Sequence, residues 1–230
     1  MRIRAIVVAT LLAFALMGCS DFKAWSYEAD PRVDRVPLLA KRVVVTPLDD
    51  LRLYENRNLG VFLACFVPLM PYGTVTINRP ELMPVWKARG VRPFKPTDDV
   101  AKAIAEELDN SGIFSQVVFS RYPKDEDLVL LGDLMVLKDD RWITLYGLTY
   151  FFGDFLWIMG APMGGTANEL TLKLTLVERE TEKVLWSQTF SECDREMEWL
   201  YSMKLALRHP RLLKMEMRQA VKSLEATLSK

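Results

Sequence analysis

Leucines at every second position constrain the fold of this 230-residue chain most strongly. They occupy residues 170, 172, 174 and 176, and threonine or lysine fills the positions between them. Because successive side chains of a strand point to opposite faces, this pattern predicts a strand with one buried face. A charged turn over residues 178–183 separates it from a second apolar run, Val184–Phe190. The two segments together predict an antiparallel hairpin.

Three further apolar segments are predicted to join the same sheet. Lys41–Leu48 is rich in valine and is bounded by proline, as in a buried strand. Residues 114–119 form a short apolar run that predicts a second strand. Residues 128–137 are almost entirely apolar on both faces, which is typical of a central strand. The sheet is therefore expected to combine parallel and antiparallel neighbours.

Helices are predicted before and after these strands. Thr97 precedes two aspartates, which suits the N-cap and first turn of a helix that ends at Gly112. Another helix is predicted over Glu196–Leu207, and a break at His209-Pro210 separates it from the last one. The last helix carries an apolar stripe of Leu213, Met217, Val221, Leu224 and Leu228.

These elements predict an α/β (α+β) fold. We expect a mixed, largely antiparallel sheet with helices on one face and two apolar insertions. A length near 200 residues suits a single domain with one sizeable core. The core is expected to unite Val44, Val45, Ile104, Leu108, Val129, Leu131, Leu174 and Leu176.

The N-terminus has the layout of a bacterial secretory signal. Arg2 and Arg4 precede an uninterrupted apolar run over residues 5–17. That run is shorter than the ~20 residues that a helix needs to cross a bilayer. A plain signal peptide and a short membrane anchor are the alternatives that this pattern leaves open.

Leu16-Met17-Gly18-Cys19 resembles the lipobox of bacterial lipoproteins. The resemblance implies that residues 1–18 are removed and that Cys19 carries acyl chains, including palmitate, that hold the chain on a membrane. Ser20 stands where an aspartate would favour the inner membrane, so the resemblance implies the periplasmic face of the outer membrane. Residues 19–40 are then expected to be a lipidated tether, and residues 41–230 a single periplasmic domain.

Charge and cysteine content narrow the range of partners. Without the two arginines of the signal, 28 basic residues stand against 30 acidic ones. This balance argues against nucleic acid, which requires a basic surface. Cys65 and Cys193 could pair in an oxidising periplasm, or Cys65 could be a buried free thiol.

Two apolar segments are candidate contact surfaces. Residues 59–77 carry no charge, and residues 142–168 carry only Asp154. Such segments either contact a membrane or protein partner or fold over the domain's own core. The candidate membrane- or partner-facing residues are Phe62, Phe66, Tyr150, Phe151, Phe152, Phe155 and Trp157.

Catalytic patterns are weak throughout the sequence. His209 is the single histidine, so zinc sites rich in histidine and most nucleophilic triads are excluded. The glycine-rich stretch Gly160–Gly165 lacks the lysine and hydroxyl residue of a phosphate-binding loop. We therefore expect a protein that is not an enzyme and that uses no metal or cofactor.

Four blocks of sequence carry a further resemblance: Val43–Leu48, Leu108–Phe114, Asp127–Gly132 and Leu174–Trp186. They resemble a group of envelope lipoproteins that shares the fold of the Tol-Pal translocation protein's amino-terminal domain. The curli secretion channel subunit belongs to the same group and has a membrane hairpin where residues 138–168 stand here.

This resemblance implies a non-enzymatic accessory or assembly component of an envelope transport or secretion system. The expected partners are the membrane, through the acyl chains on Cys19, and an envelope protein or further copies of this chain. The alternative is a binding module that shelters a lipid or another apolar ligand between the apolar segments.

Overall fold

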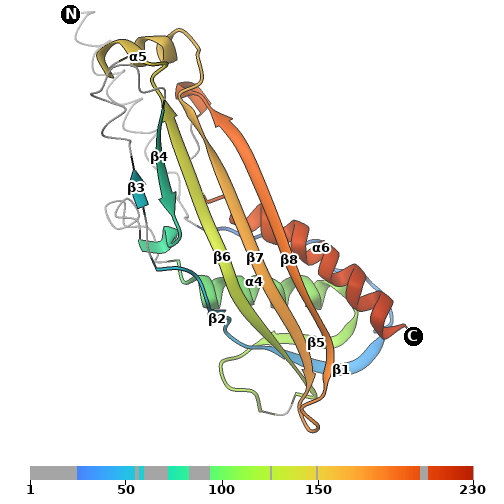
Figure 1. Ribbon diagram of the computed structural model, residues 1–230. Helices are drawn as coiled ribbons and strands as arrows, with labels where there is room; N and C mark the ends of the chain where they lie inside the picture. Colours follow the sequence, from blue (N-terminus) through green and yellow to red (C-terminus); the bar gives the residue numbers. More distant parts are fainter. Residues whose placement is uncertain are drawn as a thin grey trace, which may run out of the picture.

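Three long antiparallel strands form the backbone of the molecule in the computed structural model, which describes residues 25–54, 57–59, 72–82, 94–124, 126–148, 150–202 and 207–229. They are β6 (Leu128–Thr144), β7 (Gly164–Glu178) and β8 (Val184–Glu198). β6 pairs with β7 from Leu128 opposite Glu178 to Ile143 opposite Gly164. β7 pairs with β8 along nearly its whole length. Figure 1 shows these strands as a tall, twisted sheet.

Shorter strands flank β6 at its two ends. β1 (Leu39–Val45) lies parallel to both β6 and β5 (Phe114–Phe119), and β2 (Asp49–Asp50) is also parallel to β6. Further along, β4 (Tyr72–Ile77) pairs antiparallel with β6 and with β3 (Arg57–Leu59). The sheet is thus mixed and largely antiparallel, and β6 is central. The predicted α+β fold class is confirmed.

Two helices, α4 (Pro96–Ser111) and α6 (His209–Leu228), cover one face of the lower half of this sheet (Figure 1). α4 begins earlier than predicted: Lys95, and not Thr97, is its N-cap. Pro96 suits the first turn because its φ angle is fixed and it has no N–H to satisfy. The Asp99 carboxylate accepts a 2.8 Å hydrogen bond from the Lys95 backbone N–H, which closes that turn. Gly112 ends the helix at φ 67°, as predicted.

The core lies between these helices and the sheet. All four alternating leucines of β7 are buried there with Ile104, Leu108 and Val45. The prediction for β6 is wrong at Leu131, which is 46% exposed, and Val129 is only half-buried. The buried leucines of this strand are Leu128, Leu130, Leu134 and Leu137, whereas Leu131 faces the opposite side of the sheet. Val44 is buried but lies outside the main cluster.

The apolar segment 142–168 is the far end of the β6–β7 hairpin. β6 continues to Thr144, a short helix α5 (Tyr150–Ile158) follows, and β7 starts at Gly164. The helix predicted from Glu196 is wrong over its first residues, because β8 runs on to Glu198 in register with β7. A short 3₁₀ helix, η2 (Leu200–Ser202), follows β8. Another, η1 (Pro80–Leu82), follows β4.

Residues 25–38, which we name the N-terminal strap, run along α4 and α6 and do not form the free tether that was predicted. The Tyr27 hydroxyl donates a 2.8 Å hydrogen bond to Glu107, and Val33 N–H donates to Asn110 O at 2.7 Å. The Asp30 carboxylate binds the Arg218 guanidinium at 2.8 and 3.0 Å, and these bonds lower the Asp30 pKa. The folded domain therefore extends well before residue 41.

Candidate functional site

An apolar surface covers the end of the β6–β7 hairpin, far from α4 and α6 (Figure 1). Phe152, Phe155 and Met159 are 68%, 59% and 71% exposed. The surface, which we name the apolar tip, comprises Tyr146, Leu148, Phe152, Phe155, Ile158, Met159, Trp199, Leu200 and Tyr201. It combines the loop before α5, α5 itself, and the chain that follows β8.

The inner side of α5 is packed firmly onto the hairpin. Gly153 lies so close to the fully buried Leu145 that an added Cβ would come within 2.6 Å of its side chain. Trp157, one turn later, is buried, and its indole N–H donates a 2.9 Å hydrogen bond to Thr144 O. The prediction that Trp157 faces outward is therefore wrong, because its polar N–H has a partner inside the fold.

Two tyrosine hydroxyls bind backbone oxygens of the tip itself. Tyr146 donates to Pro162 O at 2.6 Å, and Tyr201 donates to Ile158 O at 3.1 Å. The second bond joins the chain after β8 to the end of α5. The apolar tip is thus held together by packing and hydrogen bonds while it leaves its apolar groups exposed.

The predicted contact residues have different outcomes. Phe152 and Phe155 are exposed on α5, and Tyr150 and Phe151 lie in its first turn. Cys19, Phe62, Phe66 and Cys65 lie outside the described residues, whereas Cys193 is exposed on β8. That these residues contact a partner stays a prediction.

Trp199, Leu200 and Tyr201 were missed as contact residues. Their segment was assigned to the helix predicted over Glu196–Leu207. The signal in the sequence is the run from Trp199 to Met203, which contains no charge.

Paired charges mark the boundary between the apolar tip and the rest of the sheet. Arg141 binds the buried Asp139 at 2.7 Å, and Arg208 binds Glu196. Burial raises the pKa of Glu198, the last residue of β8. Each of these arginines at the boundary therefore has an acidic partner.

Trp142 lies across the sheet at the same level. Gly165 is its partner on β7, and a Cβ there would lie 2.2 Å from the indole. The guanidinium of Arg195 on β8 stacks 4.6 Å from the ring centroid. Any larger residue at position 165 would displace the indole ring. Together, the contacts of Trp142 with Gly165 and Arg195 hold β6, β7 and β8 side by side next to the tip.

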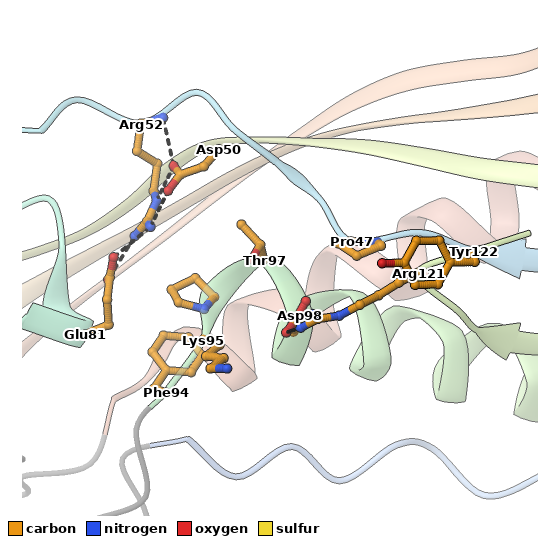
Figure 2. Close-up of a pocket in the computed structure, with 11 residues that line it drawn as sticks. Pro47, Asp50, Arg52, Glu81, Phe94, Lys95, Thr97, Asp98, Arg121 and Tyr122 are labelled. Atoms are coloured by element: carbon orange, nitrogen blue, oxygen red, sulfur yellow. Dashed lines mark hydrogen bonds and ion pairs between the residues drawn. The ribbon is translucent and has the colours of Figure 1, made fainter.

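A separate cavity of about 590 Å³ opens beside the N-terminal end of α4. Figure 2 shows two separate groups of charged side chains in its wall, one around Arg52 and one around Asp98. Arg52 binds Asp50 at 2.9 Å and Glu81 at 2.8 Å, and Asp98 binds Arg121. The hydrogen bond from Arg52 lowers the pKa of Asp50 to about 2. The Arg52–Glu81 pair joins the segment after β2 to η1, and the Asp98–Arg121 pair joins α4 to the chain after β5.

The described residues lack two further features, a metal-binding cluster and a membrane-spanning helix. Within them, no group of three or more histidine, cysteine or acidic residues could hold a metal ion. Across the same residues, no helix is both long and apolar enough to cross a membrane.

Comparison with known proteins gives only distant likenesses. No protein-family model matches the chain, and no curated protein matches it. A Xanthomonas campestris protein of the family DUF330 has a TM-score of 0.45 at 13% identity, with 88% of this chain and 93% of that one covered. A PelC dodecamer from Paraburkholderia phytofirmans has a TM-score of 0.36 at 12% identity, with 89% and 92% covered. Lipoprotein GNA1162 from Neisseria meningitidis has a TM-score of 0.26 at 17% identity, with 81% and 99% covered. At these scores the likenesses carry no argument about function.

Proposed function

We propose that this chain is a lipid-anchored, non-enzymatic protein of the bacterial envelope that acts as an accessory or assembly component of a transport or secretion system. The observation that supports it is the apolar tip. Exposed apolar patches of more than a few hundred Å² are uncommon on soluble monomers and tend to mark interaction surfaces. The lipobox-like Leu16–Cys19 supplies the anchor in this proposal.

The rigidity of the apolar tip supports a docking role over a chance exposure. Gly153 and Trp157 fix the inner side of α5, so Phe152 and Phe155 face outward without being needed for the core. Their exposure costs solvation free energy of roughly 25 cal/mol per Å² of apolar area. A partner that covers these side chains recovers that free energy on binding.

A binding module for an apolar ligand is the second candidate. A cavity of about 290 Å³ lies between the strap and the two helices, with Val33 and Val221 in its wall. This volume is at the lower limit of ordinary ligand pockets, about 300–1,000 Å³. Stoichiometric phospholipid in the purified protein would favour this second candidate.

Lipidation at Cys19 is the first prediction. Cells grown with radiolabelled palmitate are expected to label the wild-type chain, and Cys19→Ser is expected to abolish the label and move the protein out of the membrane fraction. Ser20→Ala serves as the matched control and should retain both. An unlabelled wild-type chain would contradict the proposed anchor.

The second prediction concerns the apolar tip. Phe155→Glu is expected to leave the thermal midpoint within a few degrees of wild type, because Phe155 is 59% exposed. It should abolish cross-linking of the tip to envelope components in intact cells. Val184→Glu, at a 55% exposed apolar residue on the opposite end of β8, is the control and should change neither quantity. Collapse of the fold, or intact cross-linking, with Phe155→Glu would remove the tip from the proposal.

A further inference from the structure

We infer that the apolar tip lies in the surface of the same bilayer that holds the acyl chains of Cys19, so that the long hairpin points toward that membrane. This inference rests on the proposed function, because it requires the lipid anchor. It names a lipid surface, and no protein, as what covers the tip.

The direction of the strap is the first argument. From its C-terminal to its N-terminal end, the strap pairs Arg35 with Glu225 of α6, then Asp30 with Arg218, and Glu28 O with Lys214. Its contacts therefore move toward the N-terminus of α6.

The N-terminus of α6 lies on the tip side of the sheet. There, His209 Nε2 donates a 2.9 Å hydrogen bond to Lys138 O, whereas Ser223 accepts a 3.0 Å bond from Trp186 near the other end of β8. From its C-terminal to its N-terminal end, the strap thus runs toward the tip side of the sheet.

Trp25 lies near the level of His209 along the length of the sheet. Trp25 is three residues beyond Glu28, a distance of about 10 Å in an extended chain. Lys214 is five residues into α6 from His209, which is about 7.5 Å of helix. The two lengths nearly match, so Trp25 is level with the N-terminal end of α6. Its ring stacks on Phe94, with the ring centroids 4.8 Å apart.

The reach of the linker is the second argument. Cys19 is six residues from Trp25, and an extended chain covers at most about 20 Å over that span. The part of β6 from Lys138 to its end at Thr144 is also six residues, again about 20 Å. A fully extended linker therefore brings the lipidated cysteine to the level of Thr144, at the base of the apolar tip.

A bilayer at the opposite end of the hairpin is out of reach. The linker would have to run back beside the strap, which spans 14 residues from Trp25 to Leu39, or up to about 45 Å. The anchor and the apolar tip therefore face the same membrane.

The chemistry of the apolar tip suits a lipid surface. Asp154 is the only charged residue from Trp142 to Asn168, and the tyrosine hydroxyls of the tip already have backbone partners. Aromatic rings with one polar edge favour the membrane interface, and the phenylalanine, isoleucine and methionine side chains favour the acyl boundary. A short linker keeps this bilayer at a high effective concentration, so a weak tip–lipid contact is occupied most of the time.

Depth measurement tests the inference directly. A fluorescent probe is attached at Met159→Cys in the acylated full chain, with Cys65 and Cys193 replaced by serine, in vesicles of phosphatidylethanolamine and phosphatidylglycerol. Lipids with a nitroxide on the acyl chain are expected to quench it several-fold more strongly than the same probe at Val184→Cys. Equal quenching at the two positions would overturn the inference.

Partitioning of the acyl-free mature chain gives a second measurement. Residues 19–230 with Cys19→Ser are expected to bind the same vesicles weakly, and Phe155→Glu should lower the partition coefficient roughly ten- to a hundredfold. Val184→Glu should leave it unchanged. Binding that does not depend on Phe155 would contradict the inference.

Palmitate labelling distinguishes a failure of the proposed anchor from a failure of the tip–bilayer contact. An unlabelled Cys19 overturns the proposed anchor and the inference with it. A labelled Cys19 with equal quenching at positions 159 and 184 overturns the inference alone. Cross-links from Met159 to an envelope protein, without quenching by lipid, would replace the bilayer with a protein partner.

Discussion

Glu216→Gln is expected to raise the free energy of unfolding at neutral pH by about 3 kcal/mol. Glu216 is 1% exposed between α6 and the sheet, and neither of its carboxyl oxygens has a hydrogen-bond partner. Burial, together with the nearby Glu192 carboxylate, raises its pKa to about 9. The folded protein therefore keeps a proton at pH 7 that the unfolded chain releases.

The sign of the pH dependence follows from this difference. With a folded-state pKa of about 9 and an unfolded value of 4.5, the stabilising contribution of protonated Glu216 is complete below pH 4.5 and is lost as pH rises toward 9. Over that window wild type should lose about 1.4 kcal/mol per pH unit relative to Glu216→Gln. Urea unfolding between pH 4 and 9 measures it.

Glu182→Gln is the control for this titration, since Glu182 is exposed in the β7–β8 turn. It should leave the pH profile unchanged. Parallel stability curves for wild type and Glu216→Gln across the whole range would show that Glu216 ionises normally in the folded protein.

Leu108→Ala is expected to lower the free energy of unfolding by about 2–5 kcal/mol, the range for large-to-small changes in a packed core. Leu108 is 1% exposed on α4 and belongs to the main core cluster. The loss combines removal of buried methyl groups with the cavity that remains. Equilibrium denaturation by urea provides the measurement.

Leu131→Ala is the matched comparison because the same atoms are removed from the uncovered face of β6. With its side chain 46% exposed, the loss should stay below about 1 kcal/mol. Equal losses at positions 108 and 131 would mean that Leu131 is packed as closely as Leu108.

Periodicity predicted the elements that bury one apolar face. The leucines of β7, the stripe of α6 and Gly112 each follow from local geometry, and the structure places them as expected. Leu131 was misassigned because residues 128–131 are all apolar, so the sequence does not distinguish the covered face from the open one.

The part of the sheet nearest the apolar tip, from Lys138 of β6 onward, could not be predicted from the pattern of apolar residues. Lys138, Asp139, Asp140 and Arg141 interrupt β6 with charge, yet the strand continues because Arg141 binds Asp139 and Lys138 binds Asp140 at 2.6 Å. In β8, Glu196 pairs with Arg208 in the same way. These ion pairs join residues two or twelve positions apart, and they leave no apolar periodicity in the sequence.

Only part of the candidate site could be predicted from the sequence. The absence of charge over 142–168 pointed to the α5 region, and Phe152 and Phe155 are exposed there. Whether Trp157 faces inward depends on its hydrogen bond to Thr144 O, which only the folded hairpin creates. The strap was missed because its contacts are made by single residues, such as Trp25, Tyr27 and Asp30, that follow no repeating pattern.

The strap also determines how the domain bears mechanical load. Its bonds join it to both helices: Glu107 and Asn110 lie near the C-terminal end of α4, and Arg218 lies in the middle of α6. With the proposed lipid anchor at Cys19, a pull from the membrane would load these bonds together, because they join one strap to both helices. The load would then pass through the helical layer to the long sheet.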